Sequence, residues 1–172
     1  MTETISWVTH GNGFVEIRPR PGVWKQSTFD WKKKTIWDAF CDSFEKNPNS
    51  KFLGCRRWDR ESQFGSYTWT TYSEVMTSCA EIAAALASAG VQRQEKVAIF
   101  ANNCPQFLIA ELALVRQSFV SVPVYSTFGT TPVAFILTQC AIRIAFVSSE
   151  MLPTLIESAE AARRDSGAQS LV

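Results

Sequence analysis

Hydrophobic positions recur at helical spacing in two segments of the first half of the chain. Residues 36–44 place apolar side chains three and four positions apart, which predicts an amphipathic helix that ends before Pro48. Residues 75–86 repeat this spacing. The T-x-x-E sequence that starts at Thr71 is a capping box, in which each side chain satisfies a free backbone amide at the start of a helix. Gly90 supplies the expected C-terminal stop of that second helix.

Between these helices the pattern changes to that of extended chain. Residues 52–56 and 66–70 are rich in aromatic, β-branched and small apolar residues, and the stretch 57–65 between them is mostly polar. This arrangement predicts two strands joined as a β-hairpin. Tyr67 and Trp69, two positions apart, are expected on the same face of it.

Beyond residue 96, apolar segments of strand length alternate with segments of helix length. The expected strands are 97–101, 119–125 and 143–147. The first expected helix is 106–117, which Pro105 opens, and the second starts at Thr131–Pro132. Ser149 caps the third, whose apolar face consists of Leu152, Leu155, Ile156 and Ala159. This alternation predicts a parallel sheet with right-handed crossovers. The fold class is therefore α/β, with three layers and helices on both faces of the sheet. Residues 170–172 resemble the start of a further strand, so we expect the domain to be truncated at its C-terminal end.

The first 34 residues differ from the rest. Prolines and glycines interrupt any regular spacing of hydrophobic positions there. We therefore interpret residues 1–34 as an irregular basic and aromatic arm, and residues 35–172 as the folded domain. The Gly11–Gly13 segment is interpreted as a turn that no strand precedes. Residues 18–34 carry a local charge of +5, from six basic side chains and one acidic side chain. This favours a solvated arm, and the alternative is a contact with an anionic lipid surface or a partner.

The amino-acid composition argues against several functional classes of protein. The chain has 172 residues, of which 46% are hydrophobic, so it can build a core. A net charge of +1 argues against binding to nucleic acid. Five widely spaced cysteines without a C-x-x-C pair, and a single histidine, argue against a zinc cluster and against a secreted disulfide framework. Without a signal peptide or an apolar run long enough to span a bilayer, we expect a cytoplasmic protein, or one on the cytosolic face of an organelle membrane.

No residue pattern provides convincing catalytic chemistry. The Gly129 segment lies between a strand and a helix but lacks the second glycine and the lysine of a phosphate loop, so it is interpreted as a turn and helix cap. Cys104 is expected to be a structural, buried cysteine rather than a nucleophile. Glu111 is expected at a rim or in one ion pair. Ser148 and Ser149 lack the glycines of a nucleophile elbow. Catalytic and metal-binding residues are therefore predicted to be absent.

Three segments resemble motifs of one enzyme family. Residues 67–75 read Y-T-W-T-T-Y-S-E-V and are similar to the Y-x-W-x-(S/T)-Y-x-E-V motif of long-chain fatty acyl-CoA synthetases. Residues 97–111 read V-A-I-F-A-N-N-C-P-Q-F-L-I-A-E and resemble their V-x-I-F-x-x-N-x-P-E-W-x-I-A-E motif. Residues 122–129 read V-P-V-Y-S-T-F-G, similar to V-P-L-Y-D-T-L-G. The departures are Gln106 for glutamate, Phe107 for tryptophan and Ser126 for aspartate, and they indicate a divergent member or paralogue.

The resemblance implies an AMP-forming ligase that joins a long-chain fatty acid to CoA, with acyl-adenylate as the intermediate and with ATP, Mg and CoA as the cofactors of the parent enzyme. The family's S/T-S-G-T-T-G-x-P-K-G phosphate loop and its later motifs do not occur in this chain. The chain is thus expected to be the N-terminal part of such a ligase, to bind no cofactor and to be inactive alone, with the downstream subdomains of the same enzyme as its partners. The positions that match family motifs, with an expected structural or cleft role, are Asn103, Pro105, Tyr125, Thr127 and Gly129.

Two alternatives stay open at this point. The chain could be a non-catalytic interaction or regulatory α/β module derived from such a ligase. An exposed apolar patch of several hundred Å² would argue against it, because such a patch marks a missing partner subdomain. A small flavodoxin-like nucleotide binder would need a glycine-rich turn after Ala101, and residues 102–105 do not provide one.

Overall fold

The computed structural model describes residues 6–9, 15–18, 35–56 and 65–165. The chain divides into two compact units, Met1–Lys34 and Thr35–Val172. In the first unit, β1 (Ser6–Thr9) pairs antiparallel with β2 (Val15–Arg18), so the expectation that no strand precedes Gly11 was wrong. A four-residue strand is too short to show a clear period, and its pairing partner decides its conformation. Residues 10–14, which hold the expected turn, and residues 19–34 of the basic segment lie outside the described part of the chain.

The second unit begins with a helix, a hairpin and a second helix, as predicted. Helix α1 (Ile36–Lys46) starts with a capping box in which the Asp38 N–H donates to Thr35 Oγ1 over 3.2 Å. Strands β3 (Lys51–Arg56) and β4 (Tyr67–Thr71) pair antiparallel. The rings of Tyr67 and Trp69 stack with centroids 5.5 Å apart, which confirms that they share a face.

Helix α2 (Tyr72–Ser88) has the predicted ends. Thr71 forms its N-cap, and the carboxylate of Glu74 accepts the backbone N–H of Thr71 over 2.7 Å. Gly90 follows the C-cap with φ of +78°, a left-handed conformation that costs little without a Cβ. Four apolar side chains of α2, those of Val75, Cys79, Ala83 and Leu86, are buried.

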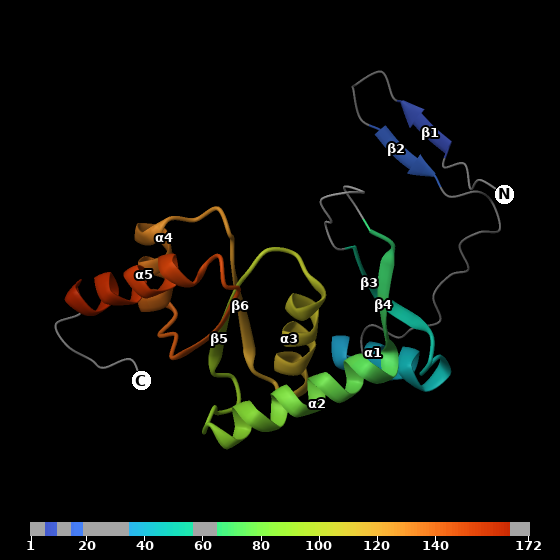
Figure 1. Cartoon of the computed structure of the whole chain (residues 1–172), viewed down its shortest axis with the longest axis horizontal. Helices are drawn as coiled ribbons and strands as arrows, with labels where there is room; N and C mark the ends of the chain where they lie inside the picture. Colours follow the sequence, from blue (N-terminus) through green and yellow to red (C-terminus); the bar gives the residue numbers. More distant parts are fainter. Residues whose placement is uncertain (1–5, 10–14, 19–34, 57–64, 166–172) are drawn as a thin grey trace. The chain divides into compact units, whose positions relative to one another are not determined.

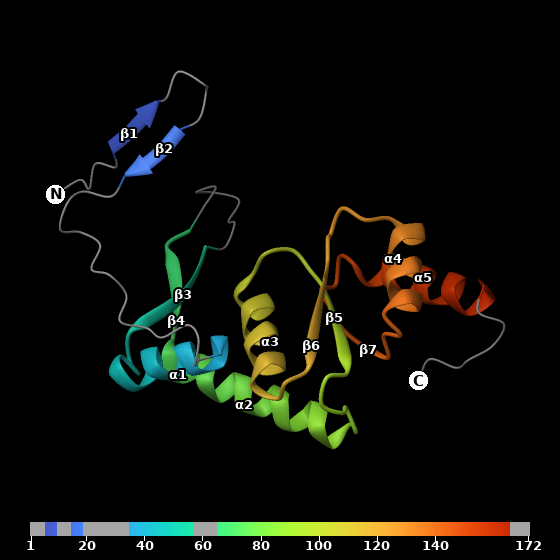
Figure 2. The same cartoon turned by 180° about the vertical axis from the view of Figure 1, so that it is seen from behind.

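A three-stranded parallel sheet forms the centre of this unit, in the order β6-β5-β7 (Figure 1, with β7 labelled in Figure 2). Its strands are β5 (Lys96–Phe100), β6 (Val120–Val124) and β7 (Ile144–Val147). The connecting helices are α3 (Pro105–Arg116) and α4 (Thr130–Gln139), and α5 (Leu152–Asp165) follows the last strand. The predicted α/β class with a parallel sheet is confirmed.

Helices cover both faces of the sheet, as the view from behind also shows (Figure 2). The alternating side chains of β5 define the two faces. Val97 and Ile99 pack in a cluster with residues of α2 and α3. Ala98 and Phe100 pack in a second cluster with residues of α4 and α5. All four side chains are at most 1% exposed, as expected for the central strand of a sheet that is buried on both sides.

A third cluster joins α1 and the hairpin to this core. It contains Phe40, Val75 and Cys79, packed against α3 and β3. Phe52 of β3 stacks on Tyr72 of α2 with ring centroids 4.3 Å apart. The hairpin is thus held by aromatic contacts at the base of α2 rather than by further strands.

Helix α5 differs from its prediction. It begins at Leu152 and not directly after Ser149, because residues 148–151 form a turn in which the Met151 N–H donates to the carbonyl oxygen of Ser148 over 3.0 Å. Leu155 and Ala159 pack on the sheet as expected. Leu152 and Ile156 are instead exposed by 43% and 51%. No helix among the described residues has both the length and the apolar character needed to cross a bilayer.

Candidate functional site

The carboxyl ends of the three parallel strands lie at one edge of the sheet. The loop after β5 (residues 101–104), the loop after β6 (residues 125–129) and the loop after β7 (residues 148–151) start there. In open α/β sheets, ligands bind in the crevice at this edge. The crevice forms between two adjacent strands whose following helices pack on opposite faces of the sheet. Strands β5 and β7 meet this condition, because α3 and α5 pack on opposite faces.

Two cavities flank the loop after β5. The first has a volume of about 320 Å³ and lies between this loop and the end of β6. Of the five predicted site residues, Asn103 and Tyr125 line it. Its complete lining is Ala101, Asn102, Asn103, Phe107, Pro123, Val124, Tyr125 and Ser126. The structure therefore brings together residues from two of the three motif segments.

The loop after β6 shapes one wall of this first cavity. The Phe128 N–H donates to the carbonyl oxygen of Tyr125 over 3.0 Å, and their rings meet edge to face with centroids 5.5 Å apart. The Tyr125 side chain is 73% exposed. Thr127 and Gly129 lie in the same loop but outside the lining of both cavities. Gly129 is the N-cap of α4, as the interpretation as a turn and helix cap predicts.

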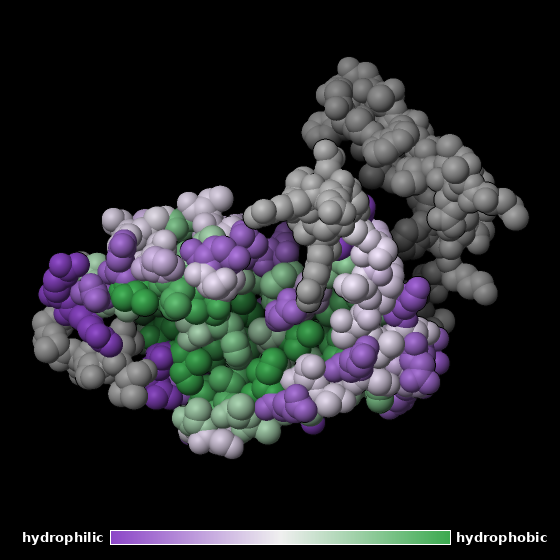
Figure 3. All heavy atoms as spheres, viewed as in Figure 1, coloured by the Kyte–Doolittle hydropathy of each residue, from purple (hydrophilic) through white to green (hydrophobic). Residues whose placement is uncertain are grey.

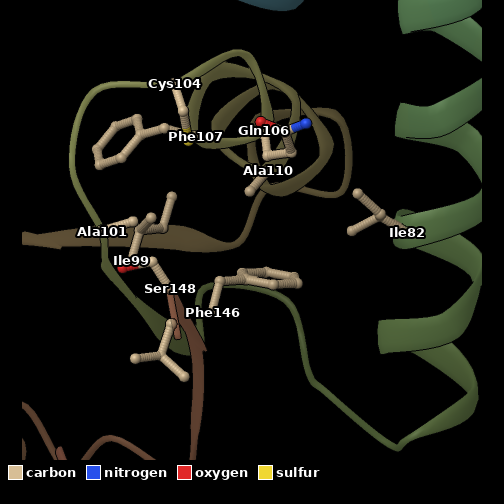
Figure 4. Close-up of a pocket in the computed structure, with 10 residues that line it drawn as sticks. Ile82, Ile99, Ala101, Cys104, Gln106, Phe107, Ala110, Phe146 and Ser148 are labelled. Carbon is tan, nitrogen blue, oxygen red and sulfur yellow. The ribbon is translucent and has the colours of Figure 1, made fainter. Parts of the chain in front are cut away.

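The second cavity, of about 360 Å³, lies on the other side of the same loop (Figure 4). Phe107 of α3 and Ala101 line both cavities, so Phe107 stands between them. Figure 4 shows Ile82 approaching from α2 and Phe146 from β7. Among its ten lining residues the side chains with polar atoms are those of Cys104, Gln106 and Ser148, so the surface is mainly hydrophobic.

The start of α3 positions the residues between the two cavities. Pro105 occupies the first turn of α3, where its missing N–H costs no hydrogen bond, as predicted. Cys104 has extended backbone angles and makes no side-chain capping bond. Its side chain is exposed, so the expectation of a buried cysteine was wrong. The buried thiol belongs to Cys79, whose pKa is raised to about 11 by burial.

Glu111 of α3 has a structural role at the start of β6, away from the carboxyl edge. Its carboxylate accepts a 2.5 Å hydrogen bond from the hydroxyl of Ser121 in β6. The expectation of a rim position or an ion pair is thus replaced by a hydrogen bond that ties α3 to the sheet. A carboxylate satisfied in this way by its own scaffold is not positioned for chemistry.

The residues at the start of α4 do not fit the phosphates of ATP. The hydroxyl of Thr130 donates to the carboxylate of Glu157 over 3.1 Å, which puts an acidic group where a phosphate would have to approach. A Cβ added to Gly129 would meet no atom within 4 Å, so this glycine is not needed for a close backbone approach. The described residues also contain no group of three side chains that could hold a metal ion. Among the described residues, the edge therefore offers amide, hydroxyl and apolar surface.

Comparison with known proteins identifies the family. Residues 43–171 match the family model described as AMP-binding enzyme. The chain belongs to this family. Long chain acyl-CoA synthetase 1 of Arabidopsis thaliana is 37% identical over 123 residues, which cover 72% of this chain and 18% of the relative. Fatty acyl-CoA synthetase B of Dictyostelium discoideum is 29% identical over 126 residues, covering 73% of this chain and 19% of the relative. The resemblance to long-chain acyl-CoA synthetases is confirmed.

Solved structures of other enzymes show the same fold. The luciferase-like enzyme of the nonluminescent mealworm Zophobas morio superimposes with a TM-score of 0.65 at 21% identity, over 81% of this chain and 32% of that protein. The anthranilate CoA ligase AuaEII, solved with anthranoyl-AMP, gives a TM-score of 0.62 at 20% identity, over 73% of this chain and 22% of the ligase. The chain thus spans less than a third of these proteins and less than a fifth of the two synthetases.

Sequence reasoning missed several lining residues. Asn102, Pro123 and Ser126 contribute to the first cavity, and Phe107 separates the two cavities. The sequence did contain a signal for these four residues, because all of them belong to the segments that resemble family motifs and three of them stand at or beside strand ends. Motif matching marks such positions but does not tell which of them face the same space.

Proposed function

We propose that this chain is the N-terminal part of a long-chain fatty acid–CoA ligase. The parent enzyme would form acyl-CoA, AMP and pyrophosphate from a fatty acid, ATP and CoA, with Mg as the metal cofactor. The observation that carries the proposal is the 37% identity to Long chain acyl-CoA synthetase 1 over 72% of this chain. The motif-bearing loops that meet at one edge of the sheet support it.

In this proposal the carboxyl edge of the sheet is one wall of the ligase cleft. Asn103 and Tyr125 line the first cavity and would face the substrates. Pro105 and Gly129 lie at the starts of α3 and α4, where the two loops end, and Thr127 lies within the second loop. The nucleotide and the metal would bind to downstream parts of the enzyme, because the edge described above does not fit a triphosphate. The 172-residue chain alone would therefore have no ligase activity.

The exposed surface favours the interpretation that this chain is part of a larger enzyme, and it argues against a self-sufficient interaction module. A continuous hydrophobic area occupies the face between α5 and α2 (Figure 3). The hydrophobic second cavity also reaches the surface, lined by Phe107 and Phe146. Large exposed apolar areas are rare on monomeric proteins and mark surfaces that another part of the protein covers.

The proposal also includes the cellular setting. The parent would work in the cytosol or on the cytosolic face of an organelle membrane, and the basic segment 18–34 would contact anionic lipid there. Co-sedimentation with vesicles that contain phosphatidylserine tests this contact. Binding should weaken when Lys32, Lys33 and Lys34 are changed to alanine and when salt is raised. Equal binding to neutral vesicles would contradict it.

A chimaera tests the ligase proposal directly. The 172-residue chain is joined to the part of Arabidopsis Long chain acyl-CoA synthetase 1 that follows its matching segment. The chimaera should release AMP in a reaction that depends on a long-chain fatty acid and CoA, whereas the 172-residue chain alone and the Arabidopsis part alone should not. Turnover by the 172-residue chain alone would contradict the claim that it is incomplete. A folded chimaera without turnover would contradict the ligase assignment.

A further inference from the structure

The two faces of the β3–β4 hairpin have different surroundings. On one face, Phe52 and Leu53 of β3 pack against the cluster that contains Phe40. On the other face, the side chains of Tyr67 and Trp69 are 56% and 44% exposed. Tryptophan is on average a largely buried residue in folded proteins, so two neighbouring exposed rings on one face indicate a contact surface.

The hairpin holds these two rings in a fixed arrangement. Its register places Gly54 directly opposite Trp69. A Cβ on Gly54 would lie 2.8 Å from Cζ3 of Trp69, so the indole ring lies across the neighbouring strand at this glycine. The ring of Tyr67 stacks on the indole with an interplanar angle of 28°. Because the pair is already ordered, a partner that binds to it does not have to immobilise two mobile side chains.

Two cations flank the aromatic pair. The Nζ atom of Lys51 lies 5.4 Å from the ring centroid of Trp69, and the guanidinium carbon of Arg56 lies 5.4 Å from the ring centroid of Tyr67. Neither β3 nor β4 contains an acidic residue. The acidic side chain that follows β4, that of Glu74, is held in the capping box of α2. Lys51, Arg56, Tyr67 and Trp69 thus form an aromatic–basic face.

The hairpin projects from its unit. Figures 1 and 2 both show β3 and β4 extending from the end of the unit where α1 and α2 lie, with α3 between the hairpin and the parallel sheet. Within the described part of the chain, these two strands pair with each other and with no third strand. A projecting surface of this kind can approach a broad, flat partner.

The chemistry of the face matches the surface of an anionic lipid bilayer. Tryptophan and tyrosine prefer the boundary between water and lipid, because each combines an apolar ring with a polar group. Lysine and arginine are attracted to the negative headgroups of the cytoplasmic leaflet. A stable protein partner would bury about 1,200–2,000 Å² in total, which four side chains on two short strands do not provide. The net charge of +1 argues against nucleic acid.

We propose that the aromatic–basic face of the β3–β4 hairpin docks on an anionic lipid bilayer. The rings of Tyr67 and Trp69 would lie at the level of the headgroups, with Lys51 and Arg56 beside the lipid phosphates. The inference rests on the proposed function for its purpose, because long-chain fatty acids partition into bilayers and a ligase held there meets its substrate. The contact is separate from the one proposed for residues 18–34.

Co-sedimentation of the 172-residue chain with vesicles of equal parts phosphatidylserine and phosphatidylcholine tests the inference. Lys51→Ala should weaken binding about fivefold, and Trp69→Ala about tenfold or more. Lys96→Ala and Phe135→Ala are the matched controls, because they remove the same charge and another exposed aromatic ring outside the hairpin. Both controls should bind like the unmodified protein. Equal binding of all four variants would overturn the inference.

A variant that keeps an aromatic ring at the same position separates lipid contact from folding. Lipids with brominated acyl chains quench the fluorescence of tryptophans that reach the bilayer. Trp69→Phe should still bind the vesicles, but the quenched fraction of its tryptophan fluorescence should be smaller than in the unmodified protein. An equal quenched fraction in the two proteins would place Trp69 away from the lipid and overturn the inference.

The same measurements on the chimaera described above separate this inference from the proposed function. Weaker binding of Lys51→Ala in both the 172-residue chain and the chimaera supports the inference. Vesicle binding that is lost in the chimaera would overturn it and assign the face to the downstream part of the enzyme. An inactive, folded chimaera whose binding still depends on Lys51 and Trp69 would contradict the ligase proposal and support the lipid contact.

Discussion

Three helices of the second unit end in the same backbone motif, but only one of them has a glycine in the left-handed position. Gly90, Ser118 and Ala141 have φ of 78°, 58° and 52° and follow the C-caps of α2, α3 and α4. At the end of α4, the Ile142 N–H donates to the carbonyl oxygen of Leu137 over 2.9 Å, which completes a Schellman motif. We predict that Ala141→Gly stabilises the protein.

The magnitude follows from the backbone conformation. A left-handed conformation costs a residue with a Cβ roughly 1–2 kcal/mol. Glycine removes this cost but adds conformational entropy to the unfolded chain, which offsets about 0.4–1 kcal/mol. We therefore expect Ala141→Gly to raise the free energy of unfolding by about 1 kcal/mol, which corresponds to an increase in Tm of about 2–4 °C.

Gly90→Ala is the matched control. A Cβ at Gly90 would meet no atom within 4 Å, so its penalty reports backbone strain without a steric clash. It should lower the free energy of unfolding by about 1 kcal/mol. Urea unfolding followed by far-UV circular dichroism measures both variants. The reasoning would be refuted if Ala141→Gly destabilised the protein while Gly90→Ala left it unchanged.

Three further predictions concern packing, pH and thiol reactivity. Gly54→Ala would place a Cβ 2.8 Å from Cζ3 of Trp69, so it should destabilise the protein by about 1–3 kcal/mol in urea unfolding. In a Trp69→Ala background this loss of stability should largely vanish, because the contact is no longer present. An equal loss in that background would contradict the contact. The pKa of Glu74 lies below 4.5 because the backbone N–H and then the hydroxyl of its capping threonine donate to the carboxylate. The pKa of Glu74 in the folded state is thus below its value in the unfolded state. The unmodified protein should therefore be more stable than Glu74→Gln above pH 4.5, and this difference should disappear as the pH falls through the lowered pKa. A difference that grew on acidification would exclude this cause. In native protein at pH 8, iodoacetamide should label the exposed Cys104 much faster than the buried Cys79, whose pKa is about 11, and comparable rates in peptide mass spectrometry would contradict the described burial.

The elements with strong local signals could be predicted from the sequence. The capping box at Thr71, the glycine stop at Gly90 and the continuous apolar run of β5 each depend on residues close in sequence. They therefore specify a helix start, a helix end and a buried strand without knowledge of the rest of the fold. The parallel direction of the strands also followed from the alternation of strands and helices, whereas the strand order β6-β5-β7 was not predicted.

Features that depend on tertiary packing were not predictable. The exposure of Cys104 depends on how the loop after β5 leaves the sheet. The late start of α5 depends on the turn after β7, and the pairing of β1 depends on a partner strand. At the candidate site, motif similarity marked Asn103 and Tyr125, but only the fold shows that Phe107 separates two cavities and that Glu157 faces the start of α4.

The most direct test of the central claim, that the carboxyl edge of this sheet is a wall of a ligase cleft, is the kcat/KM for a long-chain fatty acid in variants of the chimaera. Tyr125→Ala changes a side chain that lines the first cavity, and Arg93→Ala changes an exposed side chain before β5, at the opposite edge of the sheet. Loss of a side chain that contacts substrate in the transition state should lower kcat/KM by about tenfold or more, corresponding to about 1.4 kcal/mol. The account predicts this loss for Tyr125→Ala and an unchanged value for Arg93→Ala. Equal values of kcat/KM for the two variants and the unmodified chimaera would contradict it.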